Sequence, residues 1–436
     1  MFELNEHIQN GAVISKSHPK IEGTSDKDRI EINGKQLNVS DGKWTYELAP
    51  NETELIIKDD DREAVITDLK QGIVMLAAGQ SNMEWPVKDS ANEEYLRKQI
   101  EDADVYWLRV PRKTYREEPV DEPFRWIKLD PQNINEVSAV GLFAALETAK
   151  NTDLPIGLVG CYVGGSSAAS WTPQDLLETD ESVYKFYVTD YWSDVLDQSD
   201  EEEDRKRSEF NQLVEQYNAR FSEYEKAHPE LNRSELKRVV GHTPFPGPKG
   251  RKDFLRPSGL YENMAARLAG LAPDILLWYQ GEEDTKAPDL YHSLLNMVVG
   301  SWRKLVCREC PVIIAQLPGY NDEAAGHDWG KVRMAQMNSG IKDSHVVCLF
   351  DAGDHENIHP LDKTKPGTRL GQAASERLFG TVCEHSAHAI KYDGSHVWLD
   401  DGSVLDWTSP SYGLDNDPDP ILYGANGLPI FPFDFH

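Results

Sequence analysis

Long hydrophobic runs are missing from this sequence of 436 residues, and nowhere do about 18 apolar residues follow one another. A membrane-spanning helix is therefore not expected. The first residues also lack a basic stretch followed by an apolar one, which is the pattern of a secretory signal. We therefore expect a cytoplasmic protein.

Positive charge is scarce: 45 Lys and Arg stand against 74 Asp and Glu, a formal net charge of -29. Such a surface repels phosphate backbones and anionic lipids, so nucleic acids and membranes are not expected as partners. An anionic substrate would need a local basic patch that works against this field.

Cysteine is also scarce, with five residues in the whole chain. This number fits reduced thiols in a cytosolic protein. Cys307 and Cys310 have CxxC spacing, but no second pair completes a zinc site, so we interpret them as two unpaired thiols before a strand. We expect no metal and no cofactor, and the sequence does not indicate the oligomeric state.

The pattern of residue types divides the chain into three parts. Residues 1–70 alternate polar and apolar residues around Asn33-Gly34 and Asp41-Gly42, dipeptides that favour tight hairpins, which predicts a small β-rich module. Residues 71–380 alternate apolar runs with helical stretches such as 138–150 and 261–271. Residues 381–436 are hairpin-like and then proline-rich, which predicts a β or irregular segment.

The central part predicts an α/β fold with a five-stranded parallel sheet. The expected strands are residues 73–78, 155–161, 274–279, 311–316 and 345–350. An insertion at about 172–255 separates the second strand from the third. It is highly charged, and its aromatic and aliphatic residues recur at helical spacing between Phe210 and Tyr224, which predicts an amphipathic helix.

Ser81 follows the first expected strand directly, after Gly79 and Gln80. Ligands bind at the carboxyl ends of parallel strands, and a glycine beside a serine lets the chain turn sharply and expose the hydroxyl. Met83 stands where the nucleophile elbow of α/β-hydrolases has its second glycine, so that motif is not met. Ser81 is nevertheless a candidate nucleophile.

The other expected strand ends carry the remaining groups that acyl transfer needs. His359, in a loop after the last strand, is the candidate base, and Glu356 is a candidate to orient it. Backbone N–H groups of Gly164 or Gly165, the Ser81 N–H and the Gln280 side-chain amide are candidate donors to the oxyanion.

A rival motif lies in the same loop. Residues 355–359 read HENIH and match the zinc signature H-E-x-x-H, which requires a helix that brings both histidines to one face. Gly353 and Pro360 flank the motif and indicate a loop instead. A zinc hydrolase is therefore the weaker interpretation.

Several blocks together resemble the sialate O-acetylesterase family of SGNH-type carbohydrate esterases. They are GQSNMEW at 79–85, Gly164-Gly165-Ser166 with Trp171, RPSGLY at 256–261, WYQGE at 278–282, and Asp351 through His359-Pro360 with Lys363. The resemblance covers nearly the whole chain. It implies a three-layer α/β/α, flavodoxin-like sheet without a metal, flanked by a small β region from both terminal segments.

The resemblance also implies hydrolysis of an O-acetyl ester on a sugar, typically 9-O-acetylated sialic acid. By position, Ser81 is then the nucleophile, His359 the base, and Gly164 and Gln280 the oxyanion donors. The residues expected to bind substrate are Gln80, Asn82, Glu282 and Arg256.

Two departures from the family pattern leave details open. Asn357 stands where the family often has Asp, so the third catalytic residue is Glu356, Asp354 or Asp351. Ala169 stands where a Glu is common, and this change, with the insertion, leaves the sugar open. The alternatives are an esterase for acetylated xylan or another polysaccharide, and a non-catalytic glycan-binding protein on the same scaffold.

Overall fold

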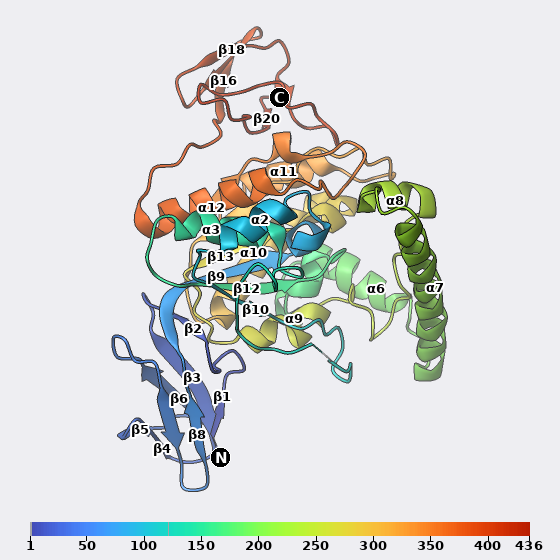
Figure 1. Cartoon of the computed structure of the whole chain (residues 1–436). Helices are drawn as coiled ribbons and strands as arrows, with labels where there is room; N and C mark the ends of the chain where they lie inside the picture. Colours follow the sequence, from blue (N-terminus) through green and yellow to red (C-terminus); the bar gives the residue numbers. More distant parts are fainter. Residues whose placement is uncertain (1, 121) are drawn as a thin grey trace.

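The computed structural model describes residues 2–120 and 122–436, and a sheet of eight strands forms its centre (Figure 1). The strand order is β11-β10-β12-β9-β13-β14-β15, with β2 paired to β9. The strands are β2 Val13–Ser15, β9 Lys70–Gly79, β10 Val105–Arg109, β11 Ile127–Lys128, β12 Ile156–Tyr162, β13 Ile275–Tyr279, β14 Val312–Ala315 and β15 Ser344–Val347.

The five strands expected from the sequence are present as β9, β12, β13, β14 and β15, but the prediction of a five-stranded, purely parallel sheet is wrong. β2 and β10 add two parallel strands, and β11 pairs antiparallel to β10. β10 escaped notice because its apolar stretch is only four residues long, too short to stand out by periodicity. β9 is central, and its residues 72–79 are all buried, as a strand covered on both faces requires.

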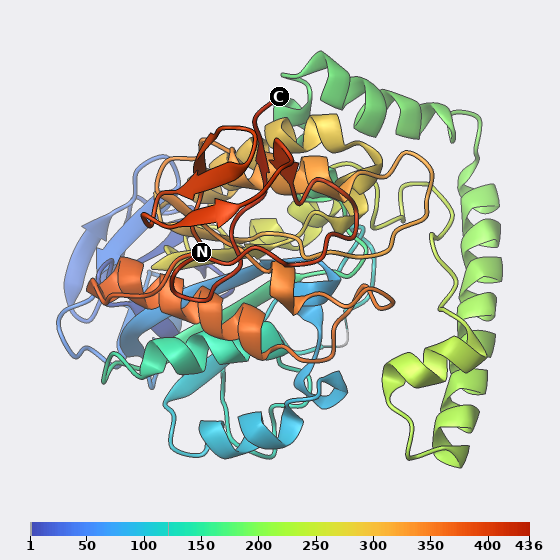
Figure 2. The same ribbon diagram turned by 90° about the horizontal axis from the view of Figure 1, so that it is seen from above.

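Helices lie against both faces of the sheet. On one face α3 (Ala139–Ala149) and α12 (Thr364–Phe379) lie side by side (Figures 1 and 2). On the other, α10 (Tyr291–Leu305) packs Trp302 against Trp278 of β13 and Trp171. The remaining helices of this part are α1 Ser81–Glu84, α2 Glu93–Ile100, α9 Gly259–Asn263 and α11 Trp329–Met337.

The prediction of a single helix at 261–271 is wrong. The chain leaves the helical region at Met264 (φ -122°, ψ -62°) and continues as a short 3₁₀ turn, Ala265–Leu268. This break lets both Leu260 and Leu268 be fully buried.

The first strands of the chain form two small antiparallel sheets, ordered β1-β3-β6 and β5-β4-β7-β8. Their bounds are β1 Phe2–Leu4, β3 Lys20–Ser25, β4 Arg29–Ile32, β5 Lys35–Asn38, β6 Lys43–Glu47, β7 Leu55–Lys58 and β8 Glu63–Ile66. Asn33-Gly34 connects the paired strands β4 and β5 with positive φ at both residues. Asp41-Gly42 also turns with positive φ, but β5 and β6 then join different sheets.

After α12 the chain forms a third group of strands and ends in it (Figure 1). β16 Ala389–Tyr392, β17 His396–Leu399 and β18 Val404–Asp406 are antiparallel, and β19 Ser411–Tyr412 pairs with β20 Phe433–Asp434. A separate hydrophobic cluster around Phe350, Tyr412 and Phe431 joins these strands to the main body.

Residues 172–255 contain α4 Gln174–Leu177, α5 Glu181–Val183, α6 Asp190–Ser193, α7 Asp200–Ala227 and α8 Arg233–Val240. α7 has 28 residues and stands at one side of the molecule, while α8 turns back toward the sheet (Figures 1 and 2). In the described ranges 2–120 and 122–436, no helix combines the length and the apolar character that crossing a bilayer requires.

Candidate active site

Ser81 lies at the carboxyl end of the central strand β9. Gly79 ends this strand with φ 140°, and a Cβ there would lie 2.0 Å from the carbonyl oxygen of Tyr279, so only glycine fits. The chain turns at this point, and Ser81 is the first residue of α1. Its own N–H therefore belongs to the first turn of a helix, where amides lack intrahelical acceptors.

The Ser81 hydroxyl contacts His359. The distance from Oγ to Nε2 is 2.7 Å, which is hydrogen-bond length. Asn357 holds the backbone of this histidine, because its Oδ1 accepts the His359 N–H and its Nδ2 donates to the His359 carbonyl. The imidazole also stacks on the indole of Trp85, with ring centroids 4.9 Å apart. The structure thus brings together a nucleophile and a base in hydrogen-bonding geometry.

The environment of His359 favours its neutral form. Burial is the main cause, followed by the positive charges of Lys363 and Lys237, and together they lower the pKa of His359 to about 3. A neutral imidazole can accept the serine proton at neutral pH.

A buried polar network lies beneath this pair. Asn82 Nδ2 donates to Glu282 Oε1 at 2.7 Å and to the carbonyl of Ile358, while Lys363 Nζ donates to Asn82 Oδ1 at 2.8 Å. All three side chains are at most 5% exposed. Burial lowers the pKa of Lys363 to about 7 and raises the pKa of Glu282. Asn82 and Glu282, expected to bind substrate, instead connect α1 to the loop that carries His359.

The expectation that Glu356 orients His359 is wrong for this structure. The Glu356 side chain is 75% exposed and forms an ion pair with Arg238 at 2.7 Å. In a loop, a residue three positions back does not share a face with the histidine, as it would in a helix. Asp351 pairs with Arg369, and Asp354 accepts the Glu356 N–H. Throughout residues 2–120 and 122–436, no carboxylate contacts Nδ1 of His359.

The two expected oxyanion donors are both occupied. The N–H of Gly164 lies beside Ser81, since a Cβ on Gly164 would come within 3.3 Å of the Ser81 Cβ, but it donates to Glu84 Oε2 at 2.6 Å. The other carboxylate oxygen of Glu84 pairs with Arg109.

The expectation that the Gln280 amide donates to the oxyanion is wrong for this structure. The Gln280 side-chain nitrogen donates to Asp284 Oδ2 at 2.6 Å and to the Ser166 carbonyl, so the fully buried amide points away from Ser81. Its oxygen finds no partner in the described residues, yet rotating the amide would place that oxygen against two acceptors. Gln280 is therefore a structural residue.

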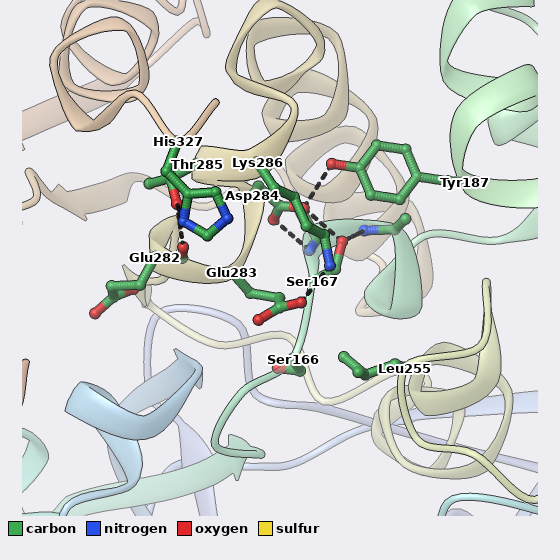
Figure 3. A network of polar contacts seen from close by, with 12 residues as sticks. Ser166, Ser167, Tyr187, Leu255, Glu282, Glu283, Asp284, Thr285, Lys286 and His327 are labelled. Carbon is green, nitrogen blue, oxygen red and sulfur yellow. Dashed lines mark hydrogen bonds and ion pairs between the residues drawn. The ribbon is translucent and has the colours of Figure 1, made fainter. Parts of the chain in front are cut away.

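Asp284, which accepts the hydrogen bond from Gln280, is the centre of a polar network (Figure 3). Its carboxylate also accepts hydrogen bonds from Ser167 Oγ at 2.5 Å, Ala168 N at 2.8 Å and Tyr187 OH at 2.8 Å. These bonds join the loops after β12 and β13 to the start of the insertion. They hold the glycine turn of Gly164 in place next to Ser81.

Two further residues expected to bind substrate lie elsewhere. Gln80 is 2% exposed, and its side-chain oxygen accepts from the N–H groups of Gly281 and Glu283. Arg256 pairs with Glu262 and lines a separate cavity with Tyr115 and Trp192, so it does not face Ser81.

The cavity that opens at Ser81 measures about 310 Å³ and is rich in charge. It is lined by Ser81, Glu84, Trp85, Pro86, Lys88, Asp89, Arg109, Glu136 and Arg233. Arg233 comes from α8, which crosses above Trp85 together with Lys237, whose amine lies 5.7 Å from the indole centroid.

Glu84, Trp85, Arg233 and Lys237 received no role from the sequence. Glu84 and Trp85 had a usable signal, because they lie three and four positions after Ser81 and so share its helical face. Arg233 and Lys237 had only a faint one, a basic pair at i and i+4 in a strongly acidic chain.

The HENIH segment is not helical, and its two histidines diverge. His355 Nδ1 contacts Asp417 at 2.6 Å, whereas His359 contacts Ser81. The geometry that H-E-x-x-H requires for zinc is therefore not met. The two cysteines of the CxxC motif are free, Cys307 exposed and Cys310 buried.

Comparisons with known proteins found a family match. A family model described as carbohydrate esterase, sialic acid-specific acetylesterase, matches residues 71–201 and 246–378. Residues 202–245, which contain nearly all of α7 and the whole of α8, lie outside the match. A search of curated proteins found no match.

Solved structures include a similar fold. A carbohydrate acetylesterase from Xanthomonas citri matches with a TM-score of 0.70 and 21% identity, covering 99% of each chain. A protein from Arabidopsis thaliana (TM-score 0.38, 15% identity, 72% of this chain and 99% of its own) and a family two carbohydrate esterase from Cellvibrio japonicus (0.28, 8%, 87% and 96%) are more distant and carry no argument.

The family match covers more than half of the chain, and it includes both the strand end that carries Ser81 and the loop that carries His359. The protein therefore belongs to the sialic acid-specific acetylesterase family of carbohydrate esterases.

Proposed function

We propose that the protein hydrolyses acetyl esters on a sugar, with Ser81 as nucleophile and His359 as base. The observation that carries this proposal is the 2.7 Å contact between Ser81 Oγ and His359 Nε2 at the end of the central strand. A serine paired with a neutral imidazole is the arrangement that activates a hydroxyl for attack on a carbonyl.

In the proposed reaction, His359 Nε2 takes the proton of Ser81 as Oγ bonds to the acetyl carbon. The tetrahedral intermediate collapses when His359 returns this proton to the departing sugar oxygen, which leaves an acetyl group on Ser81. A water molecule, deprotonated by His359, then attacks this ester. Acetate leaves, and Ser81 regains its proton.

The N–H groups of Ser81 and Gly164 are the proposed donors to the oxyanion. The Gly164 N–H is now held by Glu84, so the substrate oxygen must displace this carboxylate. Arg109 can keep Glu84 in its ion pair after the exchange, since it binds the other carboxylate oxygen. Glu84 Oε2 thus occupies the position proposed for the oxyanion until substrate enters.

Among the described residues, His359 has no orienting carboxylate. The Asn357 bonds to its backbone and the stacked Trp85 ring fix the direction of the imidazole instead. We therefore propose a Ser81–His359 dyad.

The proposed substrate is an acidic acetylated sugar, of which 9-O-acetylated sialic acid is the type. Four cations line or cover the cavity of a chain whose net charge is -29. Lys88, Arg109 and Arg233 are paired with Glu136, Glu84 and Asp89. Lys237 makes no ion pair with any described residue, and this leaves its ammonium free to meet a sugar carboxylate. An acetylated neutral polysaccharide is the alternative substrate.

A non-catalytic glycan-binding protein is the second candidate function. It is favoured by the occupied Gly164 N–H and by the absence of a carboxylate at His359 among the described residues. It predicts binding of the acetylated sugar without release of acetate, equally in wild type and Ser81→Ala.

The test is acetate release from 9-O-acetylated sialic acid, from an acetylated neutral xylo-oligosaccharide and from an aryl acetate. Wild type, Ser81→Ala and the exposed-helix control Ser193→Ala are compared, each with and without a chelator. We expect release by wild type and Ser193→Ala, no effect of the chelator, and preference for the acidic sugar. Release that persists in Ser81→Ala would contradict the mechanism, and equal rates on both sugars would contradict the substrate.

A further inference from the structure

A cluster of potential metal ligands lies outside the proposed active site. Glu376 near the end of α12, together with Cys383 and His385 in the segment that follows, brings a carboxylate, a thiol and an imidazole within 4.8 Å of one another. Since α12 begins at Thr364 and a helix rises 1.5 Å per residue, Glu376 lies about 18 Å along the axis from the end near His359.

The distances between the ligand atoms fit a tetrahedral ion. Cys383 Sγ lies 3.5 Å from both His385 Nε2 and Glu376 Oε2, and His385 Nε2 lies 2.9 Å from Glu376 Oε2. Zinc bonds to sulfur at about 2.3 Å and to nitrogen and oxygen at about 2.0–2.2 Å, which separates tetrahedral ligands by about 3.3–3.6 Å. Only slight widening of the contact between histidine and carboxylate is needed.

A second histidine supports the orientation of the first. His385 Nδ1 lies 3.2 Å from His345 Nε2 on the edge strand β15. A hydrogen bond between these nitrogens directs the opposite nitrogen of His385, Nε2, toward Cys383 and Glu376. Metal-binding histidines commonly make such a bond with the ring nitrogen that does not hold the metal.

We propose that Glu376, Cys383 and His385 form a zinc-binding site. A thiolate and an imidazole together select a borderline-soft divalent ion rather than calcium or magnesium. The His385 and Glu376 side chains are 37% and 31% exposed, so the fourth coordination position is open to water.

The site has a structural consequence. Residues 380–388 have no regular secondary structure, and they connect α12 to the strands of the C-terminal part. A zinc ion would fix this connection to α12, and through His345 to the edge of the central sheet. The site is independent of Ser81 and His359, so its loss leaves acetate release intact at a temperature where the protein is folded.

The test uses the full chain, stripped with a chelator and then dialysed against Zn²⁺ or Co²⁺. We expect one zinc per chain by mass spectrometry of the metal content, a higher Tm with zinc, and the sulfur-to-metal absorption band of a cobalt thiolate. Cys383→Ser should lose the band and the zinc dependence of Tm, whereas the exposed-cysteine control Cys307→Ser should keep both. His345→Phe should weaken zinc binding about 10-fold or more without removing the band.

Three outcomes would overturn the proposal. If zinc content and Tm are equal in wild type and Cys383→Ser, the three side chains form only a hydrogen-bonded cluster and do not bind zinc. A cobalt spectrum without the thiolate band would exclude Cys383 as a ligand. Loss of zinc in His355→Ala instead of His385→Gln would move the metal to the HENIH segment.

Discussion

The floor and the roof of the proposed active site are built in opposite ways. The floor, formed by Asn82, Glu282 and Lys363, is buried, and each of its side chains is held by hydrogen bonds to elements of the central fold. The roof, helix α8 with Arg233 and Lys237, is partly exposed, basic and outside the family match. The comparison indicates that the floor fixes the geometry of Ser81 and His359, and that Lys363 of the floor and the cations of the roof, after burial, together lower the pKa of His359.

The largest expected effect comes from removing the hydroxyl of Ser81, which lies between the floor and the roof. Ser81→Ala should lower kcat/KM for acetate release by about 10³-fold or more, because no other nucleophile among the described residues touches His359. Its Tm should stay at the wild-type value, since the hydroxyl makes no other described contact than that with His359. A clearly smaller loss of kcat/KM in Ser81→Ala would mean that another residue is the nucleophile.

A change in the floor should affect folding and activity together. Lys363→Met leaves Asn82 Oδ1 without its donor and removes the positive charge that acts on the buried Glu282, which should cost about 3–5 kcal/mol of unfolding free energy. Denaturant unfolding measures this cost, with the exposed neighbour Lys365→Met as control.

Adding Glu282→Gln to Lys363→Met sharpens the test. Gln at position 282 has no negative charge. The double variant therefore does not bury a carboxylate that has lost the nearby cation, so part of the lost stability should return. A double variant that is as unstable as the sum of both single variants would contradict the coupling of charge between Lys363 and Glu282.

The acidic limb of the pH profile tests the environment that burial, Lys363 of the floor and the cations of the roof create together. Since burial and the cations lower the pKa of His359 to about 3, kcat/KM should stay level as the pH falls through 6.5. A histidine with an ordinary pKa of about 6.5 would lose about 16-fold between pH 6.5 and pH 5 on its neutral fraction alone.

The same shift predicts the direction of stability with pH. Lowered pKa values of His7, His345 and His359 mean that the unfolded chain binds more protons than the folded one below pH 6.5. Stability should therefore fall as the pH drops from 6.5 toward 4. Circular dichroism at each pH separates this loss from the titration of the base.

A change in the roof should act on charge rather than on folding. Lys237→Met removes one cation near His359, so it should raise the pKa of this histidine and shift the acidic limb of kcat/KM upward. It should also raise KM for an acidic sugar more than for a neutral one. The control Lys226→Met, an exposed lysine in the last turn of α7, should change neither. Unchanged Tm values would show that the effect does not arise from the floor.

The smallest effect is expected at Glu356. Because its carboxylate pairs with Arg238 at the surface, Glu356→Gln should change kcat/KM by less than about two-fold. A loss near that of His359→Ala would show that the loop rearranges to form a triad.

The sequence predicted the part of the site that follows from strand ends. Ser81 after Gly79 and His359 before Pro360 were found because glycines, prolines and apolar runs mark where buried strands stop. The five core strands were found for the same reason. β10 was missed because four apolar residues among polar ones give no clear period.

The rest depends on contacts that no local pattern encodes. The role expected of Gln280 failed because Asp284, four positions later, captures its amide in the folded chain. Arg256 was assigned from its place in a matched block, yet its cavity is a different one. The docking of α8 over Trp85 joins residues about 150 positions apart, and the charges of an insertion do not indicate where it packs.

The most direct test of the Ser81–His359 pair is labelling with a fluorophosphonate, followed by mass spectrometry to locate the adduct. This measurement does not depend on the identity of the sugar. The account predicts one adduct per chain on Ser81, formed at the same rate in Glu356→Gln and far more slowly in His359→Ala. An adduct on another residue, or equal rates in wild type and His359→Ala, would contradict it.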